Sequence, residues 1–111
     1  MPTYIPRKGD YIAVTFDPPS GHEQKGRRPA LVVSNDAFNR HTGLAMVCPI
    51  TNARRGYPFH VPIPGDATLA GVVMVEQVTS IDFGAREARR ISRAAPGVHD
   101  EVLSLLDACI Y

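Results

Sequence analysis

Several kinds of protein are excluded by what this sequence lacks. It has only two cysteines, Cys48 and Cys109, which lie far apart in apolar surroundings and outside any metal-binding spacing. The chain therefore has neither a disulfide framework nor a metal-site signal, and we expect both cysteines to be buried, reduced thiols of a cytoplasmic protein. No apolar run reaches membrane-spanning length, and the N-terminus has no apolar signal region, so we expect no membrane association.

The standard strong catalytic motifs are absent as well. The sequence contains no P-loop, no glycine-rich dinucleotide fingerprint, no zinc-ligand spacing and no nucleophile elbow. We therefore expect no metal and no cofactor. Any function has to come from residues without such a signature.

The apolar runs that are present are short and separated by turn residues, which is typical of a β-rich domain. At 111 residues the chain suits a single domain over 1–111. Prolines in the run 57–64 indicate an edge strand, and the almost wholly apolar run 71–78 indicates a central one. A short helix is predicted from an N-cap at Asp36 to a stop at Gly43. The predicted strands cover residues 10–16, 29–35, 44–51, 57–64, 71–78, 79–83 and 88–91.

The end of the chain has a different period. Its apolar residues follow one helical stripe, formed by Val98, Val102, Leu105, Leu106, Cys109 and Ile110. Pro96 suits the first turn of such a helix. The sequence therefore predicts a mainly β fold, an SH3-like small barrel of five to seven antiparallel strands with a C-terminal amphipathic helix.

Charge is distributed unevenly along the chain. All twelve Lys and Arg lie in residues 1–93 together with eight acidic residues, a net charge of +4. The tail from Ala94 has three acidic residues and no basic one, a net charge of −3. This asymmetry suits an anionic partner, although charge runs are more often solvated faces.

Two residues at strand ends are candidates for contact with phosphate. The guanidinium of Arg28 suits phosphate, and Pro29 holds Arg28 where a loop meets a strand. The hydroxyl of Thr51, at the end of "CPIT", can hydrogen-bond a phosphate oxygen. Taken alone, each has a simpler explanation, a surface arginine and a β-favouring residue at a strand terminus.

The candidates for proton transfer near Arg28 are His22 and Glu23. Glu76 and Gln77 interrupt an apolar run, and a buried carboxylate there would need a partner. Other cations could contact nucleic acid or simply increase solubility: Lys25, Arg27, Arg54, Arg55 and Arg86. Spacing alone thus predicts a small β-barrel with a basic face.

Several linked segments, in this order, resemble the MazF/PemK (Kid) toxin family. They are "GDYIAVTFDPPSGHEQKGRRPALVVS", "CPIT", "GYPFHV", "GVVMVEQVTSID" and the closing helix, so the resemblance runs from about Gly9 to the end. The resemblance implies a bacterial toxin of a type II toxin–antitoxin system that cuts single-stranded mRNA at short sequences without the ribosome. It also implies an SH3-like homodimer and a cognate MazE-like antitoxin with an acidic segment that occupies the RNA groove.

The resemblance also assigns roles to individual residues. Arg28, Thr51 and Glu23 match catalytic positions of the family, and Gln77 matches its glutamine. In the Kid branch an arginine stands where this chain has Met74, whereas Glu76 and His22 match. Because the Arg28–Thr51 site is complete, the chain fits the MazF branch. The residues expected to bind RNA are His22, Lys25, Arg27, Arg54, Arg55, Gln77, Glu76 and Arg86.

The chemistry implied by the resemblance is attack of a ribose 2′-OH on the adjacent phosphate, giving 2′,3′-cyclic phosphate and 5′-OH ends. Arg28 would stabilise the charge of the phosphorane, Thr51 would anchor an oxygen, and Glu23 or His22 would serve as the base. Two alternatives use the same barrel without cleavage: a CcdB-like toxin that poisons gyrase by binding it, and a non-catalytic SH3-like RNA-binding module.

Overall fold

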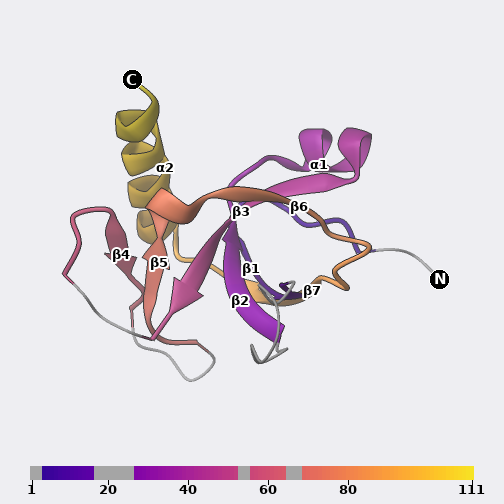
Figure 1. Cartoon of the computed structure of the whole chain (residues 1–111), viewed down its shortest axis with the longest axis horizontal. Coiled ribbons are helices and arrows are strands. Elements are labelled where there is room, and N and C mark those ends of the chain that lie inside the picture. The colour runs from indigo at the N-terminus through magenta and orange to yellow at the C-terminus, as the bar shows by residue number, and fades with distance from the viewer. Residues whose placement is uncertain (1–3, 17–26, 53–55, 65–68) are drawn as a thin grey trace, which may run out of the picture.

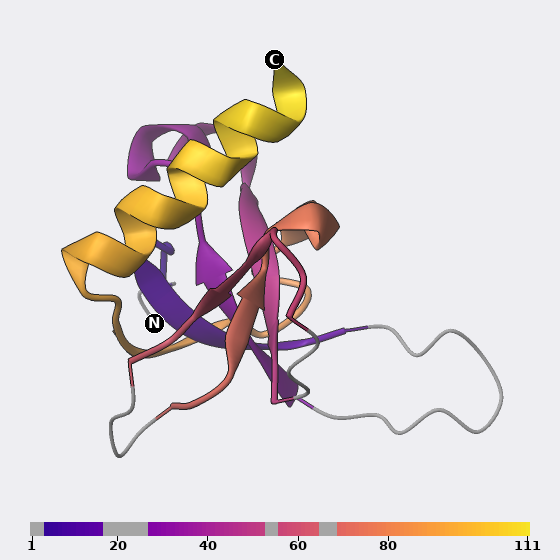
Figure 2. The same cartoon turned by 90° about the vertical axis from the view of Figure 1, so that its left-hand side faces the viewer.

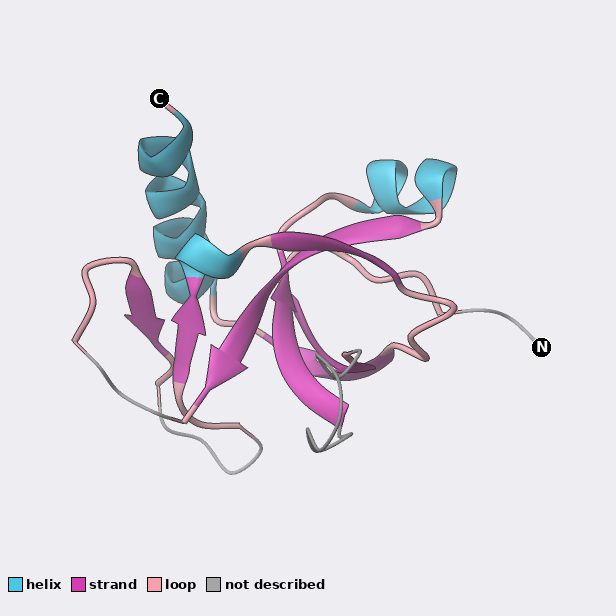
Figure 3. Ribbon diagram, viewed as in Figure 1, coloured by secondary structure: helices cyan, strands magenta, loops and turns pink. Residues whose placement is uncertain are grey.

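A computed structural model describes residues 4–16, 27–52, 56–64 and 69–111. It contains seven strands, two α-helices and one short 3₁₀ helix (Figures 1 and 3). Among the described residues, no helix is long and apolar enough to cross a membrane. The strands are β1 (Asp10–Thr15), β2 (Arg27–Val32), β3 (Leu44–Thr51), β4 (His60–Pro62), β5 (Val72–Met74), β6 (Thr79–Asp82) and β7 (Arg89–Arg93); the helices are α1 (Asp36–Thr42), η1 (Val75–Gln77) and α2 (Pro96–Ile110).

The strands form one antiparallel sheet in the order β4-β5-β3-β2-β1-β7, and β6 also pairs with β3. The predicted mainly β fold with a C-terminal helix is therefore confirmed. The sheet is open, because β4 and β7 are its two ends. Pro62 and Pro64 have no N–H to donate, which explains why the predicted strand 57–64 is reduced to the three-residue edge strand β4.

Hydrophobic residues cover both faces of the central strands. On one face, Leu31 and Cys48 pack in a cluster with Val98 and Val102 of α2. On the other face, Val32 and Val47 belong to a second cluster that also contains residues of β1 and β6. Figure 2 shows α2 lying across the sheet. Because β2 and β3 are buried on both faces, the backbones of these two strands are held rigidly.

The two helices differ from the sequence prediction in detail. The side chain of Asn35, rather than Asp36, caps α1 by accepting a hydrogen bond from the Phe38 N–H at 2.8 Å. Gly43 ends the helix as predicted, in the left-handed region at φ 74°. In α2, Cys109 was expected to be buried but is exposed, because the last turn extends beyond the sheet (Figure 2).

The predicted strand 71–78 is divided in the structure. Only β5 pairs as a strand, and the chain then turns through η1 before β6 begins. β5 lies between β4 and β3, so its predicted place inside the sheet is confirmed. The 3₁₀ turn that replaces the rest of this strand carries two of the predicted site residues, Glu76 and Gln77.

Candidate functional site

Arg28 and Thr51 lie at neighbouring ends of β2 and β3. The ladder between these strands ends at the pair Ala30–Pro49. Continued in the same register, it would place Arg28 opposite Thr51. Because strand side chains alternate, Arg28 is on the same face as Ala30, and Thr51 is on that face too. Figure 1 shows the start of β2 and the end of β3 on the same side of the molecule, where the two strands have separated.

Beyond Pro49 the ladder between β2 and β3 ends, while β3 continues to pair on its other edge. At Ile50 and Thr51 it pairs with β5 on its other edge. Gly71, just before β5, has φ +125°, and a Cβ there would collide with the carbonyl oxygen of Thr51. A glycine is therefore required for the chain to approach the Thr51 backbone this closely. This contact holds the end of β3 in place. The side chain of Thr51 is half-buried.

Thr51 also lines a pocket of about 270 Å³ between β3, β4 and η1. Its other lining residues are Tyr57, His60, Met74, Glu76 and Gln77. His60 of β4 and Met74 of β5 are directly paired across the strands, so they share one face of the sheet. The sheet thus brings together Thr51, Glu76 and Gln77, which were predicted as site residues from separate parts of the sequence.

Glu76 and Gln77 are exposed because η1 bulges out of the ladder. Between its pairing with β5 and its pairing with β6, β3 has two residues, whereas the facing segment has five. Three of these five form η1. Val75 of η1 is buried in the core and anchors the turn, while Glu76 and Gln77 face solvent.

His60 and Tyr57 were not predicted as site residues. His60 Nε2 lies 3.0 Å from Glu76 Oε2, and its ring packs against Tyr57 with centroids 4.9 Å apart. The sequence signal was a polar residue at an outward position of an alternating strand, within the segment "GYPFHV" that carries part of the family resemblance. It did not reveal that β4 and η1 are neighbours.

Arg27 serves a different face from Arg28. It donates hydrogen bonds to the Ala13 carbonyl at 2.8 Å and the Thr15 hydroxyl at 3.2 Å, and it also bonds the Glu87 carbonyl. Its guanidinium lies 3.9 Å from the Glu87 carboxylate. These contacts link β2 to β1 and to the segment before β7, so its donors are largely used within the protein.

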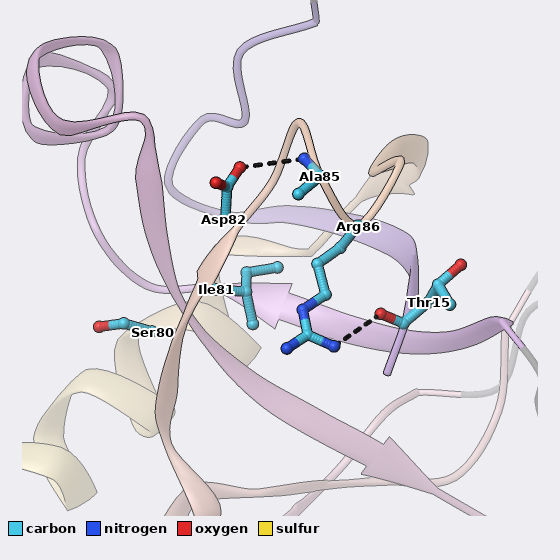
Figure 4. A pocket seen from close by; sticks show the side chains of 6 residues that line it. All are labelled: Thr15, Ser80, Ile81, Asp82, Ala85 and Arg86. Carbon is cyan, nitrogen blue, oxygen red and sulfur yellow. Dashed lines mark hydrogen bonds between the residues drawn. The ribbon is translucent and has the colours of Figure 1, made fainter. Parts of the chain in front are cut away.

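Arg86 lies at a second pocket, formed by Thr15, Ser80, Ile81, Asp82 and Ala85 (Figure 4). Its guanidinium donates to the Thr15 carbonyl at 3.3 Å. Nearby, Arg90 and Arg93 contact the buried carboxylate of Asp10 at 3.4 and 3.0 Å. Part of the basic cluster 86–93 is therefore occupied with fastening β1 to β7.

The remaining predicted site residues are not described. Glu23, His22, Lys25, Arg54 and Arg55 lie outside the described residues. In the described part of the chain, no three His, Cys, Asp or Glu side chains are grouped so as to hold a metal ion.

The ionisable groups with displaced pKa values lie away from the pocket surface. Burial raises the pKa of the Cys48 thiol to about 12, with a smaller contribution from the Glu76 charge, so this cysteine is a protonated core residue, as predicted. Burial lowers the pKa of His99 on α2, and the positive charge of Lys8 lowers it further, while Asp100 opposes the change.

Comparison with known proteins relates this geometry to a family. The family described as "PemK-like, MazF-like toxin of type II toxin–antitoxin system" matches residues 7–110. The chain is 42% identical over 107 residues to the endoribonuclease toxin MazF of Escherichia coli K12, covering 96% of this chain and 92% of that protein. It is 46% identical over 108 residues to the endoribonuclease toxin ChpB of the same strain, covering 93% and 92%.

Solved structures agree with this relationship. A chain in the crystal structure of MazE–MazF (Form-II) from Deinococcus radiodurans superposes with a TM-score of 0.90 at 40% sequence identity. The match covers 97% of both chains. The fold is thus shared with that structure over nearly the whole chain.

Proposed function

This chain belongs to the family of PemK-like, MazF-like toxins of type II toxin–antitoxin systems, and we propose on that basis that it is a sequence-specific endoribonuclease. It cleaves single-stranded mRNA without the ribosome. The observation that carries this proposal is the position of Arg28 and Thr51, on one face at the separating ends of β2 and β3. Relatives at 42% and 46% identity are endoribonuclease toxins.

The reaction is an internal transfer at one phosphate of the RNA. The ribose 2′-oxygen forms a bond to phosphorus, the bond from phosphorus to the 5′-oxygen of the next nucleotide breaks, and a 2′,3′-cyclic phosphate remains. The 2′-OH gives its proton to a base, for which Glu23 and His22 are the candidates. The departing 5′-oxygen gains a proton and becomes a 5′-OH end.

Arg28 and Thr51 act on the phosphate itself. The fixed charge and five donors of the Arg28 guanidinium stabilise the negative charge that grows on the phosphorane. The Thr51 hydroxyl holds a non-bridging oxygen. Arg28 is not the base, because an arginine stays protonated at any physiological pH, although it can assist the departing oxygen.

The rest of the RNA follows the basic surface beside these two residues. Lys25, Arg54 and Arg55 supply positive charge to the phosphates, and Arg27 and Arg86, which bond within the protein, add to the positive potential from farther away. His22, Glu76 and Gln77 contact the ribose or the bases. Recognition depends on unstacked bases, so duplex RNA is a poor substrate. The protein acts in the cytoplasm as a homodimer of one domain, 1–111, and a cognate MazE-like antitoxin silences it.

The experiment that tests this proposal uses the purified protein and a long, sequence-diverse single-stranded RNA in EDTA. Cyclic-phosphate and 5′-OH product ends are expected. Arg28→Ala removes the phosphate-stabilising charge, and we expect at least a hundredfold slower cleavage, the usual effect of deleting one such group. Because Arg28 is exposed, the circular dichroism spectrum and thermal midpoint should not change.

The matched control is Arg40→Ala, which removes an exposed arginine of α1 and should leave cleavage intact. Loss of cleavage in Arg28→Ala together with loss of folded structure would count against a catalytic role. Growth arrest without any RNA cleavage by the native protein would instead favour the protein-binding toxin. Binding without cleavage would favour the RNA-binding module.

A further inference from the structure

The pocket beside Thr51 contains the carboxylate of Glu76, which is held by a hydrogen bond from the more deeply buried His60. Glu76 has a half-exposed side chain, 35%, whereas that of His60 is 4% exposed. Since a carboxylate only accepts hydrogen bonds, Nε2 of His60 carries the hydrogen that is shared with Oε2 of Glu76. Among the described residues, His60 is the hydrogen-bond partner of this carboxylate, which leaves Oε1 available on the solvent side.

His60 occupies its buried position at a cost to folding. Its Nδ1 is buried and has no hydrogen-bond partner among the described residues. Unsatisfied buried polar atoms are rare and destabilising. An apolar ring such as that of phenylalanine, although somewhat larger, would avoid this cost. The imidazole is therefore better explained by what its Nε2 does for Glu76 than by packing.

Tyr57 supplies an aromatic surface at the same place. Its ring rests against His60 at a tilt of 49°, and the residue is 51% exposed. Exposed aromatic rings are the platforms on which proteins stack unpaired bases. The pocket volume of about 270 Å³ is smaller than the usual range for whole small-molecule ligands, which suits one planar group.

We propose that Tyr57, His60 and Glu76 form a pocket for one unstacked base of the RNA, next to the scissile phosphate. Glu76 Oε1 accepts a hydrogen bond from the exocyclic amino group of that base, and His60 is the positioning residue that orients the carboxylate. Adenine, cytosine and guanine have such an amino group, whereas uracil has none: its one ring donor, N3–H, is flanked by two carbonyl oxygens that a carboxylate repels. This inference rests on the proposed endoribonuclease function and adds a specificity to it.

The location of the base follows from Thr51. This residue lines the same pocket, and its hydroxyl is proposed to hold the scissile phosphate. A base in the pocket thus belongs to a nucleotide that adjoins the cut. Uracil should be disfavoured at this nucleotide by about 5- to 150-fold, the range for one well-formed base contact.

The test is cleavage of a randomised single-stranded RNA library, with the base at each position around the cut determined by sequencing. Wild type should disfavour uracil at one adjoining position. Glu76→Gln should admit uracil there, because an amide can donate to a carbonyl oxygen. His60→Phe should also lose the discrimination, whereas His60→Gln, which places an N–H near the position of Nε2, should retain most of it.

Two readouts separate positioning from a structural role. His60→Phe should fold at least as stably as wild type in urea unfolding, since it removes the unpaired Nδ1. In a Glu76→Ala background, His60→Phe should cause no further change in base preference, because His60 acts through Glu76. Unchanged base preference in Glu76→Gln and His60→Phe, or equal effects of His60→Phe and His60→Gln, would overturn the proposal.

A binding experiment keeps the inference testable if no RNA is cut. Single-stranded 2′-O-methyl oligonucleotides that differ only in carrying A, C, G or U at one position cannot react, so they report recognition alone. Weaker binding of the U oligonucleotide by wild type, and not by Glu76→Gln, would support the pocket even if the endoribonuclease proposal failed. Equal binding of all four would refute the pocket even if RNA were cleaved.

Discussion

Thr51 combines two functions in a single residue. Its backbone carbonyl lies against Gly71, and its side chain lines the pocket on the face shared with Arg28. The backbone contact fixes where the side chain is, so the hydroxyl is positioned by the sheet rather than by a loop. Such rigid placement is what an anchor for a phosphate oxygen requires.

We predict that Thr51→Val cleaves RNA about 10- to 150-fold more slowly than wild type, as expected for loss of one hydrogen bond to a charged group. The two side chains have nearly the same shape, and valine favours strands, so the fold should persist. Rates under single-turnover conditions, with circular dichroism of each variant, provide the measurement.

The control for this residue is Thr51→Ser, which keeps the hydroxyl and should retain most of the activity. If Thr51→Val cleaved as fast as wild type, the hydroxyl would have no part in the reaction. If both variants lost activity equally, the methyl group would matter as much as the hydroxyl.

At the scale of elements, the site depends on how β3 is paired. Its first half pairs with β6 and its last two residues pair with β5, and the surplus of residues between them becomes η1. This irregularity presents Glu76 next to His60. A regular strand over 71–78 would not have done so.

We predict that Gly71→Ala damages this arrangement directly. The φ of +125° and the approach to the Thr51 carbonyl both exclude a Cβ, so unfolding free energy should fall by at least about 1–3 kcal/mol. Cleavage should fall too, even at a temperature where the variant is folded, because Thr51 has to move. Urea unfolding and cleavage rates of the same preparation test this.

Gly43→Ala is a suitable comparison. Gly43 has φ +74° but no atom within 4 Å of an added Cβ, and it lies at the end of α1, which is well separated from β4 and β5 (Figure 1). The Gly43→Ala variant should lose stability through backbone strain alone and should keep its cleavage activity when folded. Equal activity in the two folded variants would show that the Gly71 approach does not position Thr51.

Over the whole molecule, His99 of α2 is the group through which we expect stability to depend on pH. Its side chain is partly buried, and its pKa is lowered by that burial first and by the charge of Lys8 second. Arg93 acts in the same direction, while Asp100 acts against it. The folded state thus binds a proton at His99 less readily than the unfolded chain does, whose histidine titrates near pH 6.5.

We predict that this histidine contributes a loss of stability as the pH falls. Below about pH 6.5 the unfolded state takes up the proton first, so the unfolded state is stabilised relative to the folded state until the pH also falls below the folded pKa. The His99→Gln variant should lack this contribution, and its urea midpoint should decrease less than that of wild type between pH 7.5 and 5.5. Identical decreases would show that His99 does not titrate differently in the two states.

Much of this architecture follows from local patterns. Alternation and turn residues predicted most of the strands, and the 3.6-residue stripe predicted α2, because each depends on neighbours within one element. The edge position of β4 could be predicted from its prolines. The interruption of the 71–78 strand could not be predicted, because nothing in "GVVMVEQV" itself disfavours pairing. Two local predictions were wrong. The cap of α1 is Asn35 rather than Asp36, and Cys109 is exposed rather than buried, because its exposure depends on where the sheet ends.

The sequence by itself determined the mainly β fold with its closing helix, and it singled out Arg28, Thr51, Glu76 and Gln77. Only the tertiary structure decided that Thr51, Glu76 and Gln77 share one pocket and that His60, sixteen residues before Glu76, supports its carboxylate. The physical reason is that such contacts depend on strand register. A shift of one residue in the pairing of β3 would turn the Thr51 side chain away from the face that carries His60 and Met74, and register is set by the whole sheet.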